Sequence, residues 1–425
     1  MNCRVKKFGD KLNFFYLGKV MKNALVLLFL CVCTSSLAIS IGERVTVPSE
    51  ELDKPHELLI YTPPSYDYNK GQSFPVLYVV DGDYNFHYLT GLIELWSNIS
   101  AFMPEMVVVG ISGGDTQSYR KSAKPPLEPK PGEGDAGHAD VLLGVLKKEI
   151  MPFVNKNYRV NDFEILGGHS IGGLFVTYAA VHEPQLFDRF IAVSPSLWWQ
   201  NELMKDHVAE QLVKSPDLAV HLYMTLANEK GMGVHGFVEM LESQRRKSFD
   251  FKFKQFSDET HGSVGLASYQ WALFDIFKAS RMAERYFESA EAVEAYATVL
   301  SDSLGRVMPI PSGYLRNSCY AWCGDEKQRE VIDQALVKSF PADVAFFRVL
   351  VAEHLMSQNK LDEAIEWFNR AQKSAPEYVA VYHGLAQLYE KQGKKSLADE
   401  AKTKVEILLK TQRIRQWQRN EMKAY

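Results

Sequence analysis

Short apolar runs alternate with helix-like stretches between about residues 43 and 280, and this alternation restricts the fold more than any other feature of the chain. The runs are rich in β-branched residues and end in Pro, Gly or Asp, as strands do. Strands that are apolar throughout and alternate with helices predict an α/β fold, with a doubly wound, mostly parallel sheet covered on both faces. The expected strands are Glu57–Pro64, Phe74–Gly82, Met106–Ser112, Glu164–Gly168, Arg189–Ser196, His221–Asn228 and Phe251–Asp258, and residues Ala139–Tyr158 are typical of the intervening helices.

Two stretches rich in Pro and Gly interrupt the alternation, at Ser112–Pro131 and Pro131–His138. Loops of this length in an α/β domain usually border a binding site.

After about residue 281 the strand-like runs stop, and residues Leu350–Leu409 repeat with a period of 34. This period, with small residues at matching positions, is typical of two tetratricopeptide helix pairs. Because two such repeats rarely stand alone, we expect helices in residues 281–345 as well. The sequence therefore predicts an α/β domain at 41–280 and an all-helical domain at 281–425. The matching pairs are Ala352 and Ala386, Gln358 and Gln392, Lys360 and Lys394, and Ala364 and Ala398.

Stacked repeats of this kind form a concave face that suits peptide segments, so a protein or peptide partner is one expectation for the helical domain. The alternative is that the helices only pack on the α/β domain. The net charge of −4, with no basic cluster in the body of the chain, argues against nucleic acid as a partner.

Residues 1–40 predict a signal peptide. Basic residues precede the apolar run Ala24–Cys33, and small residues follow it. The run of about ten residues is too short to span a bilayer, so no membrane span is expected in the mature chain. Met21 starts a complete signal by itself, which makes residues 1–20 an N-terminal extension. We therefore expect an exported protein, periplasmic or secreted.

Removal of the signal leaves two of the five cysteines, Cys319 and Cys323. Two thiols are no disulfide scaffold, but four residues apart on one helical turn they are expected to pair in an oxidising compartment.

One stretch carries a chemical signal: Gly168-His169-Ser170-Ile171-Gly172 follows an expected strand and opens an expected helix. A sharp turn at this place holds a serine in strained backbone geometry, and only very small neighbours avoid a clash. The serine hydroxyl then stands above the carboxyl edge of the sheet. The helix behind it supplies N–H groups suited to an oxyanion. The sequence therefore predicts that Ser170 is a nucleophile; an ordinary strand-to-helix turn is the alternative.

A nucleophilic serine needs a base and, in the Ser–His–acid arrangement, a carboxylate that orients the base. His261 occupies the expected place after the last strand, whereas His169 is expected to pack under the turn. Glu229 is the first carboxylate after the strand His221–Asn228; Glu239, Glu242 and Asp258 are rivals, and a dyad without an acid stays open. The oxyanion donors are expected to be the N–H groups of Ile171 and Asp83, with Gly82 as an alternative to Asp83.

Five segments in this order resemble the esterase family of α/β-hydrolases, which includes siderophore esterases and esterase D-like and mycolyltransferase-like enzymes. The resemblance covers about residues 45–280. It implies that Ser170 and His261 are the catalytic pair and that residues Ser196–Trp199 border the pocket. The segments are FPVLYVVDGDYNF, VVVGIS, GGHSIGGLFVTYA, FDRFIAVSPSLWW and ETHGSV.

Two departures from the siderophore esterases are visible. Their arginine-rich loop after the third strand is reduced here to Arg120 with Lys121 and Lys124, and they seldom carry tetratricopeptide repeats. Arg120 is nevertheless a candidate substrate-binding residue. Trp198 and Trp199 are candidates for stacking on substrate, with space filling as the alternative.

The function expected from the sequence is a serine esterase that hydrolyses carboxylic esters, without a metal or organic cofactor. The alternatives are acyl transfer to a carbohydrate or lipid, and a non-catalytic scaffold that acts through its repeats.

Overall fold

The structure is a computed structural model that describes residues 40–423, apart from 53, 113–115, 129–135 and 282–288. The expected signal peptide and N-terminal extension lie outside the described residues, except for Ser40. Residues 42–425 form one compact unit. No helix in the described part of the chain is both long enough and apolar enough to cross a membrane.

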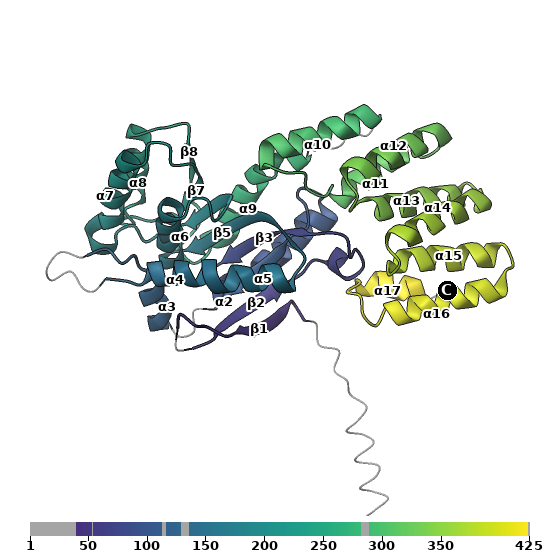
Figure 1. Cartoon of the computed structure of the whole chain (residues 1–425), viewed down its shortest axis with the longest axis horizontal. Helices are drawn as coiled ribbons and strands as arrows, with labels where there is room; N and C mark the ends of the chain where they lie inside the picture. The colour runs from purple at the N-terminus through teal and green to yellow at the C-terminus, as the bar shows by residue number, and fades with distance from the viewer. Residues whose placement is uncertain (1–39, 53, 113–115, 129–135, 282–288, 424–425) are drawn as a thin grey trace, which may run out of the picture. The chain divides into compact units, whose positions relative to one another are not determined.

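Eight strands form one sheet in the order β1-β2-β4-β3-β5-β6-β7-β8 (Figure 1). The pairs β1–β2 and β2–β4 are antiparallel, and every other pair is parallel. The predicted mostly parallel α/β sheet is therefore confirmed. The strands are β1 (Glu43–Val47), β2 (His56–Tyr61), β3 (Phe74–Val79), β4 (Val107–Ile111), β5 (Val160–His169), β6 (Arg189–Val193), β7 (Val220–Leu226) and β8 (Phe249–Gln255).

Helices cover both faces of the sheet because successive strand residues point to opposite sides. Leu77 and Val79 of β3 belong to one buried cluster, with α2 and α9. Val76 and Tyr78 belong to a second, with α4 to α8. The helices are α2 (Gly82–Glu94), α3 (Thr116–Ala123), α4 (Ala139–Val145), α5 (Met151–Asn157), α6 (Ile171–His182), α7 (Trp199–Lys214), α8 (Val234–Ser243) and α9 (Val264–Ile276), with the short helices η1 (Pro64–Asp67), η2 (Leu95–Ile99) and η3 (Leu146–Ile150).

Three details differ from the sequence expectation. Strand β1 was not expected, β5 begins four residues before the predicted Glu164, and the expected loop 112–131 contains helix α3. Residues 129–135 of the expected loops lie outside the described residues.

Helices α10 to α17 follow, and α13 to α16 form the two expected helix pairs (Figure 1). Ala352, Ala386, Ala364 and Ala398 are all buried, as close helix packing requires. The helices approach so closely at Gly384 that a Cβ there would clash with the ring of Phe368. The bounds are α10 (Ala290–Leu304), α11 (Ser312–Trp322), α12 (Glu326–Ser339), α13 (Val344–Ser357), α14 (Leu361–Ser374), α15 (Val379–Lys391), α16 (Lys395–Leu408) and α17 (Gln416–Lys423).

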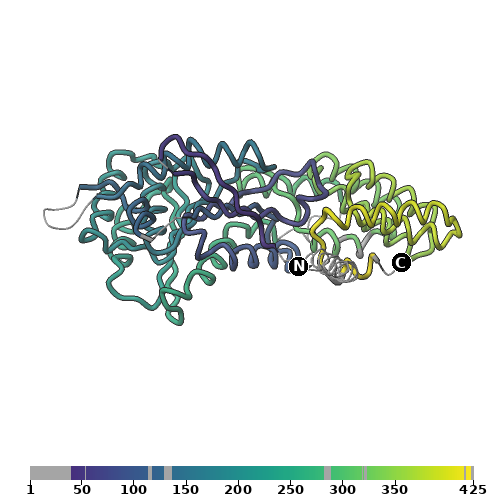
Figure 2. The backbone as a smooth tube through the Cα atoms, turned by 90° about the horizontal axis from the view of Figure 1, so that it is seen from below, coloured from purple at the N-terminus to yellow at the C-terminus, as the bar shows by residue number. Residues whose placement is uncertain are grey.

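The helical region contacts the loop between β2 and β3, which includes η1. Arg413 donates from its main chain and side chain to Asp67 Oδ2 at 2.8 and 2.9 Å. Tyr68 stacks on Tyr378 with 4.0 Å between ring centroids. Figure 2 shows the purple segment before β3 beside the yellow end of the chain. The core cluster of α2 and α9 also continues into α10 to α15, so the two regions share buried side chains.

These contacts lie at the amino edge of the parallel strands. Arg306, which follows α10, pairs with Asp162 near the start of β5. Ser170 follows the last residue of the same strand. Asp162 and Ser170 are eight residues apart in sequence, which at about 3.3 Å per residue corresponds to roughly 26 Å. The helical region therefore packs at the edge of the sheet opposite to Ser170.

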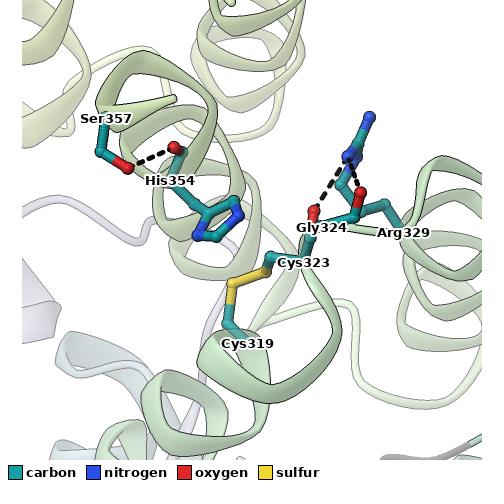
Figure 3. Close-up of a disulfide and its surroundings, with 6 residues drawn as sticks. All are labelled: Cys319, Cys323, Gly324, Arg329, His354 and Ser357. Carbon is teal, nitrogen blue, oxygen red and sulfur yellow. Dashed lines mark hydrogen bonds between the residues drawn. A yellow bond between two sulfur atoms is a disulfide. The ribbon is translucent and has the colours of Figure 1, made fainter. Parts of the chain in front are cut away.

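The two remaining cysteines form the expected disulfide. Cys319 and Cys323 lie at the end of α11 and are bonded to each other (Figure 3). Both are buried. Arg329 of α12, itself only 2% exposed, donates to the carbonyl of Cys323 at 2.8 Å. The bridge is thus enclosed by the neighbouring helices.

Candidate active site

Ser170 occupies the turn between β5 and α6 with φ 58° and ψ −114°. This left-handed φ is strained for a residue with a Cβ. The flanking glycines are required: a Cβ on Gly168 would lie 2.5 Å from the main chain of Gly172. A Cβ on Gly172 would lie 2.7 Å from the hydroxyl of Tyr119. The turn thus has the geometry of a nucleophile elbow.

Glu229 and His261 come together from two loops at the carboxyl edge. His261 Nδ1 lies 2.7 Å from Glu229 Oε1. The ring nitrogen makes no aligned hydrogen bond to that oxygen among the described residues. The Asn228 N–H donates to the carbonyl of Glu259 at 2.9 Å, so the main chain ties the two loops together. The three rival carboxylates, Glu239, Glu242 and Asp258, are exposed.

Two further serines complete this arrangement: Ser194, which sequence reasoning missed, and Ser196, which the family resemblance had placed at the border of the pocket. Ser194 is fully buried; its hydroxyl donates to Glu229 Oε2 at 2.8 Å and accepts from the Ala227 N–H at 3.0 Å. Ser196 places its hydroxyl oxygen 3.2 Å from Ser170 Oγ. Both follow β6 in the segment Ser194-Pro195-Ser196, and for Ser194 a hydroxyl directly after a strand was the only signal.

His169, which was expected to pack under the turn, is half-buried and contacts His261. The two ring centroids lie 4.5 Å apart. Because His169 directly precedes Ser170, this contact brings His261 to the elbow. Burial, and then the proximity of His261, lower the pKa of His169 to about 4. His169 is therefore neutral at physiological pH.

The expected oxyanion donors lie at two helix N-termini. Ile171 is the first residue of α6, and Asp83 is the second residue of α2. The carboxylate of Asp83 accepts a hydrogen bond from the hydroxyl of Ser112 at 2.6 Å, so side-chain contact holds this turn against the end of β4.

The three candidate substrate residues differ in exposure. Trp198 is 49% exposed, whereas Trp199 is 4% exposed and packs in the core with α7 and α8. Space filling therefore accounts for Trp199, and Trp198 offers a free aromatic surface. Arg120 is exposed on α3. Among the described residues, no three His, Cys, Asp or Glu side chains are grouped to hold a metal ion.

Comparison with known proteins shows what the chain is similar to. The family model described as "Putative esterase" matches residues 49–297, and a TPR repeat model matches residues 353–393. A siderophore triacetylfusarinine C esterase of Aspergillus fumigatus is 34% identical over 151 residues, 33% of this chain and 50% of that protein. A siderophore enterobactin esterase of Emericella nidulans is 33% identical over 150 residues, 31% of this chain and 49% of that protein. The chain thus spans about half the length of these two relatives.

Among solved structures, an IroE-like serine hydrolase from Shewanella oneidensis superposes with a TM-score of 0.59 at 22% identity, over 69% of this chain and 98% of that one. This likeness concerns the fold. The TPR repeat model matches a region of the chain after the part that the esterase model covers. Because the esterase model covers more than half of the chain, the chain belongs to the esterase family that this model describes.

Proposed function

We propose that the protein is a serine esterase that cleaves carboxylic esters through Ser170, His261 and Glu229. The observation that carries the proposal is the strained Ser170 elbow beside the Glu229–His261 pair, whose facing atoms lie 2.7 Å apart. A strained, half-buried serine beside a paired histidine and glutamate serves no need of the fold.

In the proposed reaction, Ser170 Oγ attacks the ester carbonyl carbon and His261 takes the hydroxyl proton. Glu229 holds the imidazole tautomer and stabilises the imidazolium. The N–H groups of Ile171 and Asp83 stabilise the oxyanion. His261 then protonates the leaving alcohol. Water attacks the acyl-enzyme with His261 again as the base, which releases the carboxylic acid and restores Ser170.

The proposed substrates are siderophore-like or other esters met outside the cytoplasm. The names of the two fungal relatives support the siderophore class. The exposed Trp198 supports a substrate with a flat group near the ester. The Cys319–Cys323 disulfide supports an exported location, because such bonds persist in oxidising compartments.

The test is labelling of the purified chain by a fluorophosphonate, with kcat/KM for chromogenic esters and siderophore trilactones. Ser170→Ala should lose the label and reduce kcat by on the order of 10⁶, as for other triad nucleophiles. The matched control is Ser243→Ala on α8, which removes an exposed hydroxyl bonded only to its own helix. Retention of more than a few per cent of turnover by pure Ser170→Ala would rule the proposal out.

A further inference from the structure

Asp81 lies where β3 passes into α2, and its side chain joins the two segments that carry the proposed oxyanion donors. It is 6% exposed. Its Oδ2 accepts a hydrogen bond from the N–H of His169, the residue before Ser170, at 2.8 Å. Two residues after Asp81 comes Asp83, the proposed second donor. The side chain of Asp81 therefore contacts the Ser170 turn, and the main chain of Asp81 leads to Asp83.

This side chain supplies a hydrogen bond that the sheet would otherwise supply. Strands β3 and β5 are parallel with Val79 opposite Gly167, and the Val80 N–H still donates to the carbonyl of Gly167 at 3.1 Å. In a regular parallel ladder the carbonyl of Val80 would accept from the His169 N–H. In the structure that N–H donates to Asp81. The main chain after β3 is thereby released to turn into α2.

The main chain of Asp81 in turn fixes the start of α2. Its carbonyl accepts from the Tyr84 N–H at 3.2 Å and from Asn85 Nδ2 at 2.9 Å. Asp83 lies in the chain between Asp81 and Tyr84, which the first of these hydrogen bonds joins. Gly82 packs so tightly on β4 that a Cβ there would lie 2.6 Å from Gly110. The position of Asp83 relative to the elbow is thus set through Asp81.

The surroundings of Asp81 show that the carboxylate is costly. Oδ1 is buried and has no hydrogen-bond partner among the described residues. The neighbouring titratable groups are the hydroxyls of Tyr88, Tyr119 and Tyr269 and the neutral His169, so no cation in the described part of the chain compensates the charge. Burial accordingly raises the pKa of Asp81 to about 7. A buried polar oxygen without a partner is unfavourable, and such costs concentrate at functional sites.

We infer that Asp81 is a positioning residue for the oxyanion hole: by accepting the His169 N–H it holds the N–H groups of Ile171 and Asp83 at the spacing that stabilises the oxyanion. This role rests on the proposed serine-esterase function. Asp81 should affect the energy of the transition state, because the two N–H donors bind a negative charge that develops only in the transition state. Ground-state binding of the ester does not depend on it.

The test compares Asp81→Ala, which removes the acceptor, with Asp81→Asn, which keeps an oxygen able to accept from His169. The full chain hydrolyses p-nitrophenyl butyrate, and the inhibition constant of phenylboronic acid reports the tetrahedral, oxyanion-like adduct. The matched control is Glu164→Ala. Glu164 is another buried carboxylate, on β5 at the edge opposite to Ser170, and burial also raises its pKa to about 7.

We expect Asp81→Ala to lower kcat by about 10² with KM within about threefold, on the scale of one lost oxyanion donor. Boronate affinity should fall in parallel. Asp81→Asn should recover kcat to within about fivefold, and Glu164→Ala should change stability without changing kcat.

A folded Asp81→Ala with kcat within about threefold of the unchanged protein would overturn the inference. So would equal losses in Asp81→Ala and Glu164→Ala. If Asp81→Ala does not fold, Asp81→Ser is judged by the same thresholds, and failure of both to fold would assign Asp81 to the fold as a whole, which also overturns the positioning role. Absence of labelling and turnover in the unchanged protein would instead refute the proposed function itself.

Discussion

Asp343 is a second buried carboxylate whose removal has a calculable effect on stability. It lies between α12 and α13, is 8% exposed, and its Oδ2 accepts from the Ile310 N–H at 2.9 Å. Burial, with a smaller contribution from the nearby Glu105 carboxylate, raises the pKa of Asp343 to about 8. Asp343→Asn keeps an acceptor for Ile310 and removes the charge.

The sign and size follow from linkage between ionisation and folding. A carboxyl whose pKa is raised in the folded state stabilises the fold below its unfolded pKa of 3.8, and this stabilisation is lost as the pH rises through about 8. Each pH unit within that window costs about 1.4 kcal/mol. Between pH 5 and pH 8, Asp343 should therefore lower the free energy of unfolding by roughly 3–4 kcal/mol. Asp343→Asn should not show this loss.

The assay is urea unfolding of the full chain at pH 5, 6, 7 and 8, for the unchanged protein, for Asp343→Asn and for Asp302→Asn. Asp302 is an exposed carboxylate on α10 and serves as the matched control. The difference in unfolding free energy between Asp343→Asn and the unchanged protein should grow in favour of the variant as the pH rises. Parallel pH curves for these two proteins would refute the reasoning, since Asp343 would then ionise in the folded state as it does in water.

Three further changes have definite expected outcomes. Glu229→Gln should lower kcat by about 10⁴ if Glu229 orients His261. Glu239→Gln and Glu242→Gln should change kcat little. If all three variants have the kcat of the unchanged protein, the acid lies elsewhere or the enzyme uses a Ser–His dyad. Ser194→Ala removes the hydrogen-bond partner of Glu229 Oε2 and of the Ala227 N–H. It should therefore lower kcat, and it should lower the free energy of unfolding by about 1–3 kcal/mol, measured by thermal or urea unfolding. An unchanged kcat would show that Glu229 keeps its position without Ser194. Arg413→Ala should lower the free energy of unfolding by about 1 kcal/mol and leave ester turnover unchanged, because the contacts of Arg413 to Asp67 lie at the edge of the sheet opposite to Ser170. Lys404→Ala is the control. A loss of turnover in folded Arg413→Ala would show that the two edges of the sheet are coupled.

The sequence predicted those parts of the fold that depend on apolar periodicity. Seven of the eight strands have the expected place and the helix pairs follow the 34-residue period, since both bury regular apolar faces. Strand β1 was missed because it is short and mostly exposed, with only Val47 buried. The first residues of β5, Val160-Asn161-Asp162, are exposed or half-buried and carry no strand signal.

The candidate site divides in the same way. Ser170, Glu229 and His261 could be predicted as candidates because each follows a strand at the carboxyl edge, and chain order alone places them there. The contacts of Ser194, Ser196 and Asp81 join segments far apart in sequence, such as Asp81 with His169, and chain order does not predict them. The proximity of His169 and His261 depends on how two loops meet, which periodicity does not encode.

The Arg413–Asp67 contact also has a consequence for how the chain folds during synthesis. Its two partners are 346 residues apart, so the loop around η1 is made long before its partner exists. At about 5–20 residues per second, a ribosome needs roughly 20–70 s to cover that distance. Throughout this interval Tyr68 lacks Tyr378 and Asp67 lacks Arg413. The sheet can acquire its strands early, but its amino edge is completed only at the end of translation, which exposes an apolar surface to proteases and chaperones until then.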